Sequence, residues 1–115
     1  MSLSSSPFGY SLYTLLDTLQ PTQTRSTAFR MGDLVILGVP GEMAAELGME
    51  AKAKARSSTG AACVTIGGLA DEWVSYILSA EEYRKGGYEA SVSFYGETLG
   101  VTIVAGIVRA ADGLK

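Results

Sequence analysis

The chain has 115 residues, a formal net charge of -3 and a hydrophobic content of 47%. This length has room for one small domain, and the apolar content excludes a disordered chain. The sequence contains no histidine, which excludes from this chain every catalytic triad and zinc site that needs an imidazole. A single cysteine, Cys63, excludes an internal disulfide, and 9 basic residues scattered among 12 acidic ones form no patch for nucleic acid.

The N-terminal part of the chain combines a polar leader with one predicted helix. We interpret residues 1–6 (MSLSSS) as a cloning or linker remnant, and we expect residues 7–115 to form a single domain. The remnant has neither a basic segment nor an apolar run, so no signal peptide is visible. Leucines recur at the spacing of one helical face until Pro21 ends the pattern: Leu12, Leu15, Leu16 and Leu19.

Residues 24–39 predict a β-hairpin, with a tight turn at Gly32-Asp33. Its second strand, residues 34–39 (LVILGV), is apolar on both faces, which is typical of a buried central strand. Residues 62–66 predict another buried strand, which carries Cys63. We therefore expect Cys63 to be a small core side chain, with a reactive thiol as the alternative.

Two longer helices are predicted on either side of that last strand. Residues 42–57 place small apolar side chains on one helical face, and Glu50 and Lys54 form an i, i+4 pair on the other. Residues 97–112 place a larger apolar stripe toward the core: Leu99, Ile103, Val104, Ile107, Val108 and Ala111. The elements predict a mixed α/β (α+β) fold in the order α-β-β-α-β-loop-α, in which helices pack on a small mixed sheet with open edges.

Most aromatic side chains gather between residues 69 and 96, where neither the helical nor the strand period fits: Trp73, Tyr76, Tyr83, Tyr88, Phe94 and Tyr95. Ser79 is predicted to cap one or two helical turns within this segment. A long aromatic loop after a buried strand is a common place for a ligand site. The alternative is a half-buried loop that packs on the core.

A carboxylate follows the buried strand directly in Val39-Pro40-Gly41-Glu42, at the predicted start of a helix. By itself, Glu42 is explained by the helix dipole, which an acidic residue in the first turn stabilises by about 0.3–1 kcal/mol. Its neighbours in the sequence give it a second interpretation.

Three stretches, taken in order, resemble the neutral, non-lysosomal ceramidase family: GDLVILGVPGE, GLADEWVSYILSAEEY and GGYEASVSFYGETL. The family pattern has a strand ending in V-P-G-E, a helix, a strand followed by G-L, and then spaced tyrosines leading to Y-E. Here Tyr76, Tyr83 and Tyr88 keep that spacing without a break. The resemblance covers residues 30–99 and implies the C-terminal part of the family's catalytic domain.

The resemblance implies a zinc-dependent hydrolase that cleaves the amide bond of N-acylsphingosine, as part of sphingolipid metabolism. It places Glu42 and Tyr76 on zinc-ligating positions and Tyr88 on a tyrosine that hydrogen-bonds near the reacting carbonyl. Trp73 and Tyr83 are weaker candidates for substrate binding. Carboxylate and phenolate oxygens can ligate a metal, and a phenol O–H can stabilise an oxyanion.

The sequence also departs from the family pattern. The family's histidine ligands and catalytic serine are absent from this chain. Asp71 replaces an asparagine, Trp73 replaces a tyrosine, and Leu78-Ser79-Ala80 replaces a threonine-rich stretch. We therefore expect the chain to carry part of a zinc site, to bind zinc weakly by itself, and to act on a substrate that these changes leave open.

Three hypotheses follow for the function. The chain is a fragment of a ceramidase-like zinc amidohydrolase, inactive alone and completed by a missing N-terminal portion. Alternatively, it is a non-catalytic binding or self-association module that kept the fold. In the third, a separately encoded partner supplies the missing residues. The family resemblance favours a secreted or membrane-surface location.

Overall fold

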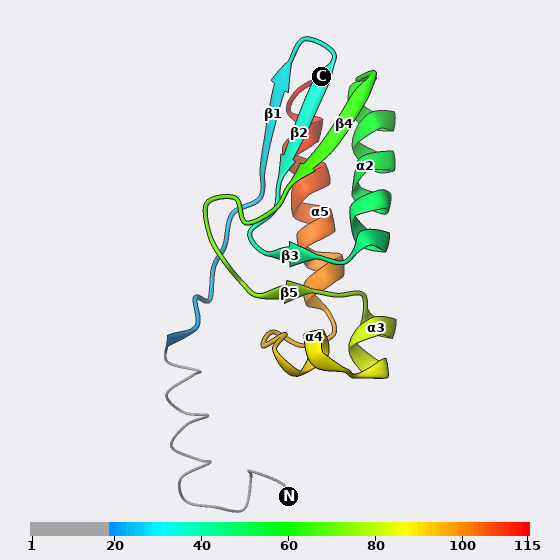
Figure 1. The fold of residues 1–115 in the computed structure, drawn as a ribbon. Helices are drawn as coiled ribbons and strands as arrows, with labels where there is room; N and C mark the ends of the chain where they lie inside the picture. Colours follow the sequence, from blue (N-terminus) through cyan, green and yellow to red (C-terminus); the bar gives the residue numbers. More distant parts are fainter. Residues whose placement is uncertain (1–18) are drawn as a thin grey trace, which may run out of the picture.

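The computed structural model describes residues 19–115. The predicted linker remnant and most of the predicted leucine helix lie outside the described residues. A mixed sheet runs through the upper half of the molecule in Figure 1. Its strands are β1 (Thr27–Met31), β2 (Leu34–Gly38) and β4 (Cys63–Gly67), in the order β1-β2-β4. β2 is therefore the central strand, antiparallel to β1 and parallel to β4.

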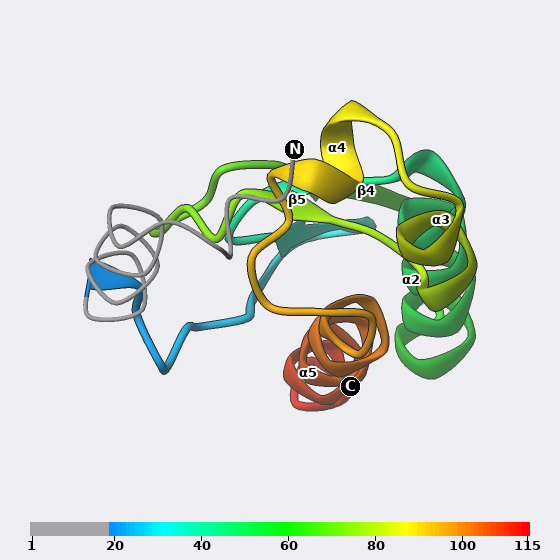
Figure 2. The same ribbon diagram turned by 90° about the horizontal axis from the view of Figure 1, so that it is seen from below.

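Two long helices, α2 (Ala45–Thr59) and α5 (Leu99–Asp112), pack against each other and against the same face of this sheet (Figures 1 and 2). α2 buries Leu47, Gly48, Ala51 and Ala55. Three of these residues, Gly48, Ala51 and Ala55, are small and let the helix lie close to its neighbours. α5 buries a larger stripe: Gly100, Ile103, Val104, Ile107 and Ala111. The strands complete the core with fully buried Val35, Leu37 and Val39.

A second, two-stranded sheet lies below the first in Figure 1, formed by β3 (Glu42–Met43) and β5 (Tyr76–Ile77). Two short helices follow β5, namely α3 (Ala80–Lys85) and α4 (Tyr88–Ser91). The segment predicted as one long aromatic loop thus contains short regular elements. They are too brief for a period to show in the sequence.

Several predictions from the sequence are confirmed. The fold class is mixed α+β, and residues 27–38 form the expected hairpin. Ser79 caps α3, since its hydroxyl accepts a hydrogen bond from the Glu82 N–H at 3.2 Å. Lys54 and Glu50 pair at 2.6 Å on the exposed side of α2. The helix predicted from Glu42 begins instead at Ala45, because Glu42 pairs with a strand.

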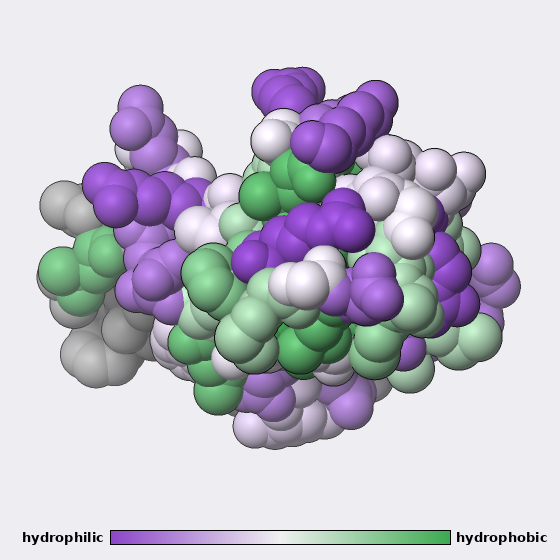
Figure 3. Space-filling model, turned by 90° about the horizontal axis from the view of Figure 1, so that it is seen from above, coloured by the Kyte–Doolittle hydropathy of each residue, from purple (hydrophilic) through white to green (hydrophobic). Residues whose placement is uncertain are grey.

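The prediction that Cys63 is a core side chain is wrong, because Cys63 is exposed. The prediction that β2 is buried on both faces is also wrong, since Leu34 and Ile36 are only half-buried. Both errors have one cause: among residues 19–115, α2 and α5 cover one face of the sheet and no helix covers the other (Figure 2). Viewed from the hairpin end, hydrophobic side chains reach the surface between hydrophilic ones (Figure 3).

Within the described residues, no helix has the length and apolarity required to cross a membrane. The longest of the described helices, α2, has 15 residues and an exposed face that carries charged side chains.

Gly100 on α5 lies close to the backbone of Leu78 and gives a test of the helix packing. A β-carbon on Gly100 would lie 2.2 Å from the Leu78 carbonyl oxygen and 2.8 Å from Leu47 Cδ1. Gly100→Ala is therefore expected to lower the free energy of unfolding by about 1–3 kcal/mol, the usual cost of overpacking. Urea unfolding followed by circular dichroism measures it.

Gly48→Ala is the matched control on α2, because its β-carbon would meet only Ile66 at 3.7 Å. This substitution is expected to raise the free energy of unfolding by up to about 1 kcal/mol, since alanine is the better helix former. Equal effects of the two substitutions would contradict the packing described for α5.

Candidate functional site

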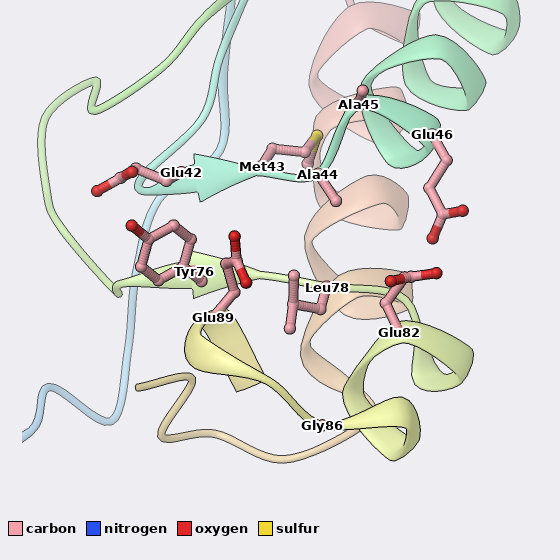
Figure 4. Close-up of a pocket in the computed structure, with 10 residues that line it drawn as sticks. All are labelled: Glu42, Met43, Ala44, Ala45, Glu46, Tyr76, Leu78, Glu82, Gly86 and Glu89. Atoms are coloured by element: carbon pink, nitrogen blue, oxygen red, sulfur yellow. The ribbon is translucent and has the colours of Figure 1, made fainter. Parts of the chain in front are cut away.

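Glu42 and Tyr76 are brought side by side by the short pairing of β3 with β5. The strands are parallel, and Glu42 is the direct partner of Tyr76 in the register. The Glu42 N–H donates to the Ser75 carbonyl at 3.0 Å, and the Ala44 N–H donates to the Ile77 carbonyl at 2.9 Å. Paired residues of neighbouring strands point to the same face, and Figure 4 shows the Tyr76 ring directly beneath the Glu42 side chain.

The Pro-Gly of the V-P-G-E motif allows this approach. A β-carbon on Gly41 would lie 2.4 Å from the Ser75 carbonyl oxygen, so only glycine lets the two strands come this close. The carbonyl of the buried Pro40 accepts a hydrogen bond from the Val74 N–H at 2.7 Å. The motif therefore carries Glu42 across from the large sheet to β5.

Two buried serines that the sequence analysis missed hold β5 in place. The Ser75 hydroxyl donates to the Val92 carbonyl, and the Ser93 hydroxyl donates to the Tyr76 carbonyl at 2.8 Å. Ser75 and Ser93 are 2% and 4% exposed. A serine inside the apolar run VSYIL was the available signal, because a buried hydroxyl needs a hydrogen-bond partner.

The loop between β4 and β5 adopts a left-handed backbone at three non-glycine residues: Leu69, Asp71 and Ser75. Asp71 has a φ of 66°. Asparagine and aspartate both tolerate this conformation better than other side chains. Aspartate at position 71 is therefore compatible with the left-handed backbone of this loop.

Tyr88 reaches the same site from α4. Its ring lies edge-on to that of Tyr76, with centroids 6.0 Å apart and an interplanar angle of 76°. This is a favourable aromatic geometry. Tyr88 remains 69% exposed to solvent. Glu89 follows it and directs its carboxylate toward the same region in Figure 4.

The electrostatics of the site favour a cation. Partial burial, followed by the negative charge of Glu42, raises the pKa of Tyr76, and Tyr88 and Glu89 contribute in the same direction. The phenol is therefore neutral at physiological pH. A bound cation would reverse this effect, because it stabilises a phenolate as it stabilises a metal-bound hydroxide.

Glu42, Tyr76 and Glu89 line a hollow of about 510 Å³ that has acidic groups at each end, and Tyr88 adjoins it through its contact with the Tyr76 ring. Glu42, Tyr76 and Glu89 lie at one end, while Glu46 and Glu82 face each other at the other (Figure 4). Across residues 19–115, no three His, Cys, Asp or Glu side chains are close enough to hold a metal by themselves. The described part of the hollow thus presents carboxylate oxygens and a phenol oxygen, but not a complete metal centre.

Trp73 and Tyr83, the weaker candidates, are placed elsewhere. Trp73 is 59% exposed and lines a separate hollow of about 250 Å³ with Phe94, Tyr95 and Leu19. Tyr83 is half-buried on α3, and neither residue is among those that line the hollow at Glu42. The structure therefore joins Glu42, Tyr76 and Tyr88 into one site and leaves Trp73 and Tyr83 outside it.

Comparison with known proteins identifies the class. The model of the family described as "Neutral/alkaline non-lysosomal ceramidase, N-terminal" matches residues 11–103, so the chain belongs to this ceramidase family. The chain is 32% identical over 79 residues to the neutral ceramidase of Pseudomonas aeruginosa, a match that covers 66% of this chain and 12% of that protein. The family prediction is thus confirmed, while its placement in the C-terminal part of the catalytic domain stays a prediction.

Two solved structures share the fold. The crystal structure of neutral ceramidase from Pseudomonas aeruginosa matches with a TM-score of 0.71 and 28% identity. A ceramidase complexed with C2 matches with the same TM-score and identity. In each case the match covers 76% of this chain and 14% of the solved chain. The chain therefore spans a small part of the relatives it matches.

The pairing of Glu42 with Tyr76 can be tested by titration. Glu42→Gln removes a negative charge beside the phenol, so the pKa of Tyr76 is expected to fall toward its ordinary value of 10.0. Phenolate absorbance measures this pKa as the difference between the chain and its Tyr76→Phe variant. Glu46→Gln, at the far end of the hollow, is the matched control and is expected to leave it unchanged.

The raised pKa of Tyr76 also makes the free energy of unfolding depend on pH. The folded chain holds the Tyr76 proton more tightly than the unfolded chain. The stabilisation from this proton is therefore present below pH 10 and is lost as the pH rises through the raised pKa. In the titration, an unchanged Tyr76 pKa in the Glu42→Gln variant would contradict the proximity of Glu42 to Tyr76.

Proposed function

We propose that this chain supplies part of the active site of a ceramidase-type amide hydrolase that cleaves N-acylsphingosine or a related lipid amide. Membership of the ceramidase family supports the reaction class. The observation that carries the proposal is the direct pairing of Glu42 with Tyr76, reinforced by the ring of Tyr88. The match spans 12% of the Pseudomonas relative, so the proposed activity is that of a larger protein to which this segment contributes.

Glu42 and Tyr76 are the residues proposed to hold zinc. A carboxylate and a phenolate are both oxygen ligands suited to this ion, and the acidic hollow favours a cation. A zinc site normally has three or four protein ligands. The isolated chain is therefore expected to bind zinc weakly, and the remaining ligands come from outside it.

The chain's own groups prepare the site for amide hydrolysis. When bound, zinc would polarise the amide carbonyl or activate a water molecule. Tyr88, which is mostly exposed, is proposed to donate a hydrogen bond to the oxyanion that develops on that carbonyl. Ser75 and Ser93 keep β5 fixed, so that Tyr76 presents its hydroxyl beside Glu42.

A second candidate function is that of a non-catalytic binding module. The observation that favours it is the uncovered face of the large sheet, where Phe29 and Met31 are 60% and 61% exposed. Under this alternative, Glu42 and Tyr76 would be structural only. Replacing either residue would then change neither metal content nor activity in any assembly.

A chimera tests the first proposal. Residues 24–112 of this chain replace the matching segment of the Pseudomonas neutral ceramidase, and zinc content and hydrolysis of N-acylsphingosine are measured. The chimera is expected to retain zinc and activity, because Glu42 and Tyr76 restore both ligands. Glu42→Gln and Tyr76→Phe are expected to lose zinc, and Tyr88→Phe to keep zinc while its kcat falls roughly 100-fold.

Glu50→Gln is the control, because Glu50 is exposed and pairs only with Lys54. It is expected to match the unmodified chimera in both zinc content and activity. A folded chimera that retains zinc after loss of the Glu42 carboxylate would refute the assignment of that ligand.

A further inference from the structure

Two serine hydroxyls join β5 to the end of α4 by a reciprocal pair of hydrogen bonds. The Ser75 hydroxyl donates to the Val92 carbonyl, and the Ser93 hydroxyl donates to the Tyr76 carbonyl at 2.8 Å. Each of the two dipeptides, residues 75–76 and residues 92–93, therefore donates one hydrogen bond to the other and accepts one in return. We call these four residues the serine clasp.

The serine clasp closes the edge of β5 that faces away from β3. The carbonyls on either side of Tyr76 in the chain accept hydrogen bonds from β3. Successive carbonyls of a strand point to opposite edges, so the Tyr76 carbonyl points away from β3, and the Ser93 hydroxyl meets it there. Ser75 and Ser93 are 2% and 4% exposed. Loss of either hydroxyl would leave a carbonyl without its partner in a place that water reaches poorly.

α4 has few other anchors. None of its residues, Tyr88–Ser91, is buried. The helix follows Gly86 and Gly87, whose φ angles of 79° and 101° lie in a region that glycine adopts freely. Among the described residues, the backbone hydrogen bonds of residues 87–93 stay within that segment. The serine clasp therefore supplies the hydrogen bonds that join α4 to β5, which lies directly above it in Figure 1.

We propose that the serine clasp positions Tyr88 against Tyr76. The clasp fixes residues 92–93 at the C-terminal end of α4, and Tyr88 is the first residue of this four-residue helix. The Tyr88 ring thus lies within one helical turn of the clasp and meets the ring of Tyr76, the residue whose carbonyl the clasp binds. An edge-on contact between rings is a weak anchor by itself when Tyr88 is 69% exposed.

Ser75 and Ser93 are therefore assigned as positioning residues, which act through Tyr88 and touch no reacting atom. The effect on activity rests on the proposed function, because it requires Tyr88 to stabilise the oxyanion. The placement of the Tyr88 ring does not rest on it and can be measured in the chain alone. The two parts are tested separately.

Nuclear Overhauser cross-peaks between the rings of Tyr76 and Tyr88 measure the placement in the 115-residue chain. Ser93→Ala is expected to weaken these cross-peaks roughly fivefold or more, because α4 loses a hydrogen bond that holds it to β5. Cross-peaks between β1 and β2 report that the fold is kept. Unchanged ring cross-peaks in the folded variant would overturn the inference.

Ser91→Ala is the matched control on the same segment. The Ser91 hydroxyl donates to the Tyr88 carbonyl at 2.6 Å, a bond that stays within α4 and does not reach β5. This variant is expected to keep the ring cross-peaks. If Ser93→Ala does not fold, Ser93→Cys replaces it, since a thiol has nearly the shape of the hydroxyl but is a weak donor. The same weakening is expected, and unchanged cross-peaks would again overturn the inference.

A double-mutant cycle in the chimera described above tests the effect on activity. Ser93→Ala is expected to keep zinc and KM while kcat falls roughly 10–100-fold, the usual result of a misplaced group. In a chimera that already carries Tyr88→Phe, the same substitution is expected to lower kcat no further, because the hydroxyl that it positions is gone. Equal fold-losses in the two backgrounds would show that Ser93 acts independently of Tyr88 and would overturn the inference.

The outcome is distinct from that of the proposed function. A folded chimera without zinc or activity would refute the proposed function. Weakened ring cross-peaks in Ser93→Ala, with Ser91→Ala unchanged, would still support the placement of Tyr88 by the serine clasp.

Discussion

The site depends on one close backbone approach, that of Gly41 to the carbonyl of Ser75. It allows β3 to pair with β5, two strands of only two residues each. So short a pairing gains little by itself, because two hydrogen bonds contribute only a few kcal/mol at most. Buried serine hydroxyls reinforce it from the other side. The Glu42 carboxylate and the Tyr76 phenol are neighbours because Gly41, which has no β-carbon, lets β3 pair with β5.

This arrangement concentrates negative charge around a neutral phenol. Glu42 and Glu89 both raise the pKa of Tyr76, so the site as it stands resists forming a phenolate. Such a site is poorly suited to acid–base chemistry near neutral pH but well suited to receive a cation. Among the described residues, no three His, Cys, Asp or Glu side chains are close enough to hold such a cation by themselves.

Two surfaces of the described residues are open to solvent, the hollow at Glu42 and one face of the large sheet. The hollow at Glu42 carries two candidate ligands, and the large sheet has one covered face. The hollow is lined by several carboxylates, whereas the open face of the sheet carries no charged side chain.

Local chemistry in the sequence was enough to determine the hairpin, both long helices, the Ser79 cap and the family. The hairpin, the helices and the cap depend on residues close together in the chain, and the family on the order of three short stretches that include the V-P-G-E motif. The two-residue strands could not be foreseen, because pairing between residues 42 and 76 is a long-range contact without a periodic signal. Cys63 was misplaced for a related reason: an apolar strand reads as buried whether or not a layer covers it. Only the tertiary structure decided which face of the sheet is covered and which side chains meet at the site, because both depend on packing between distant segments.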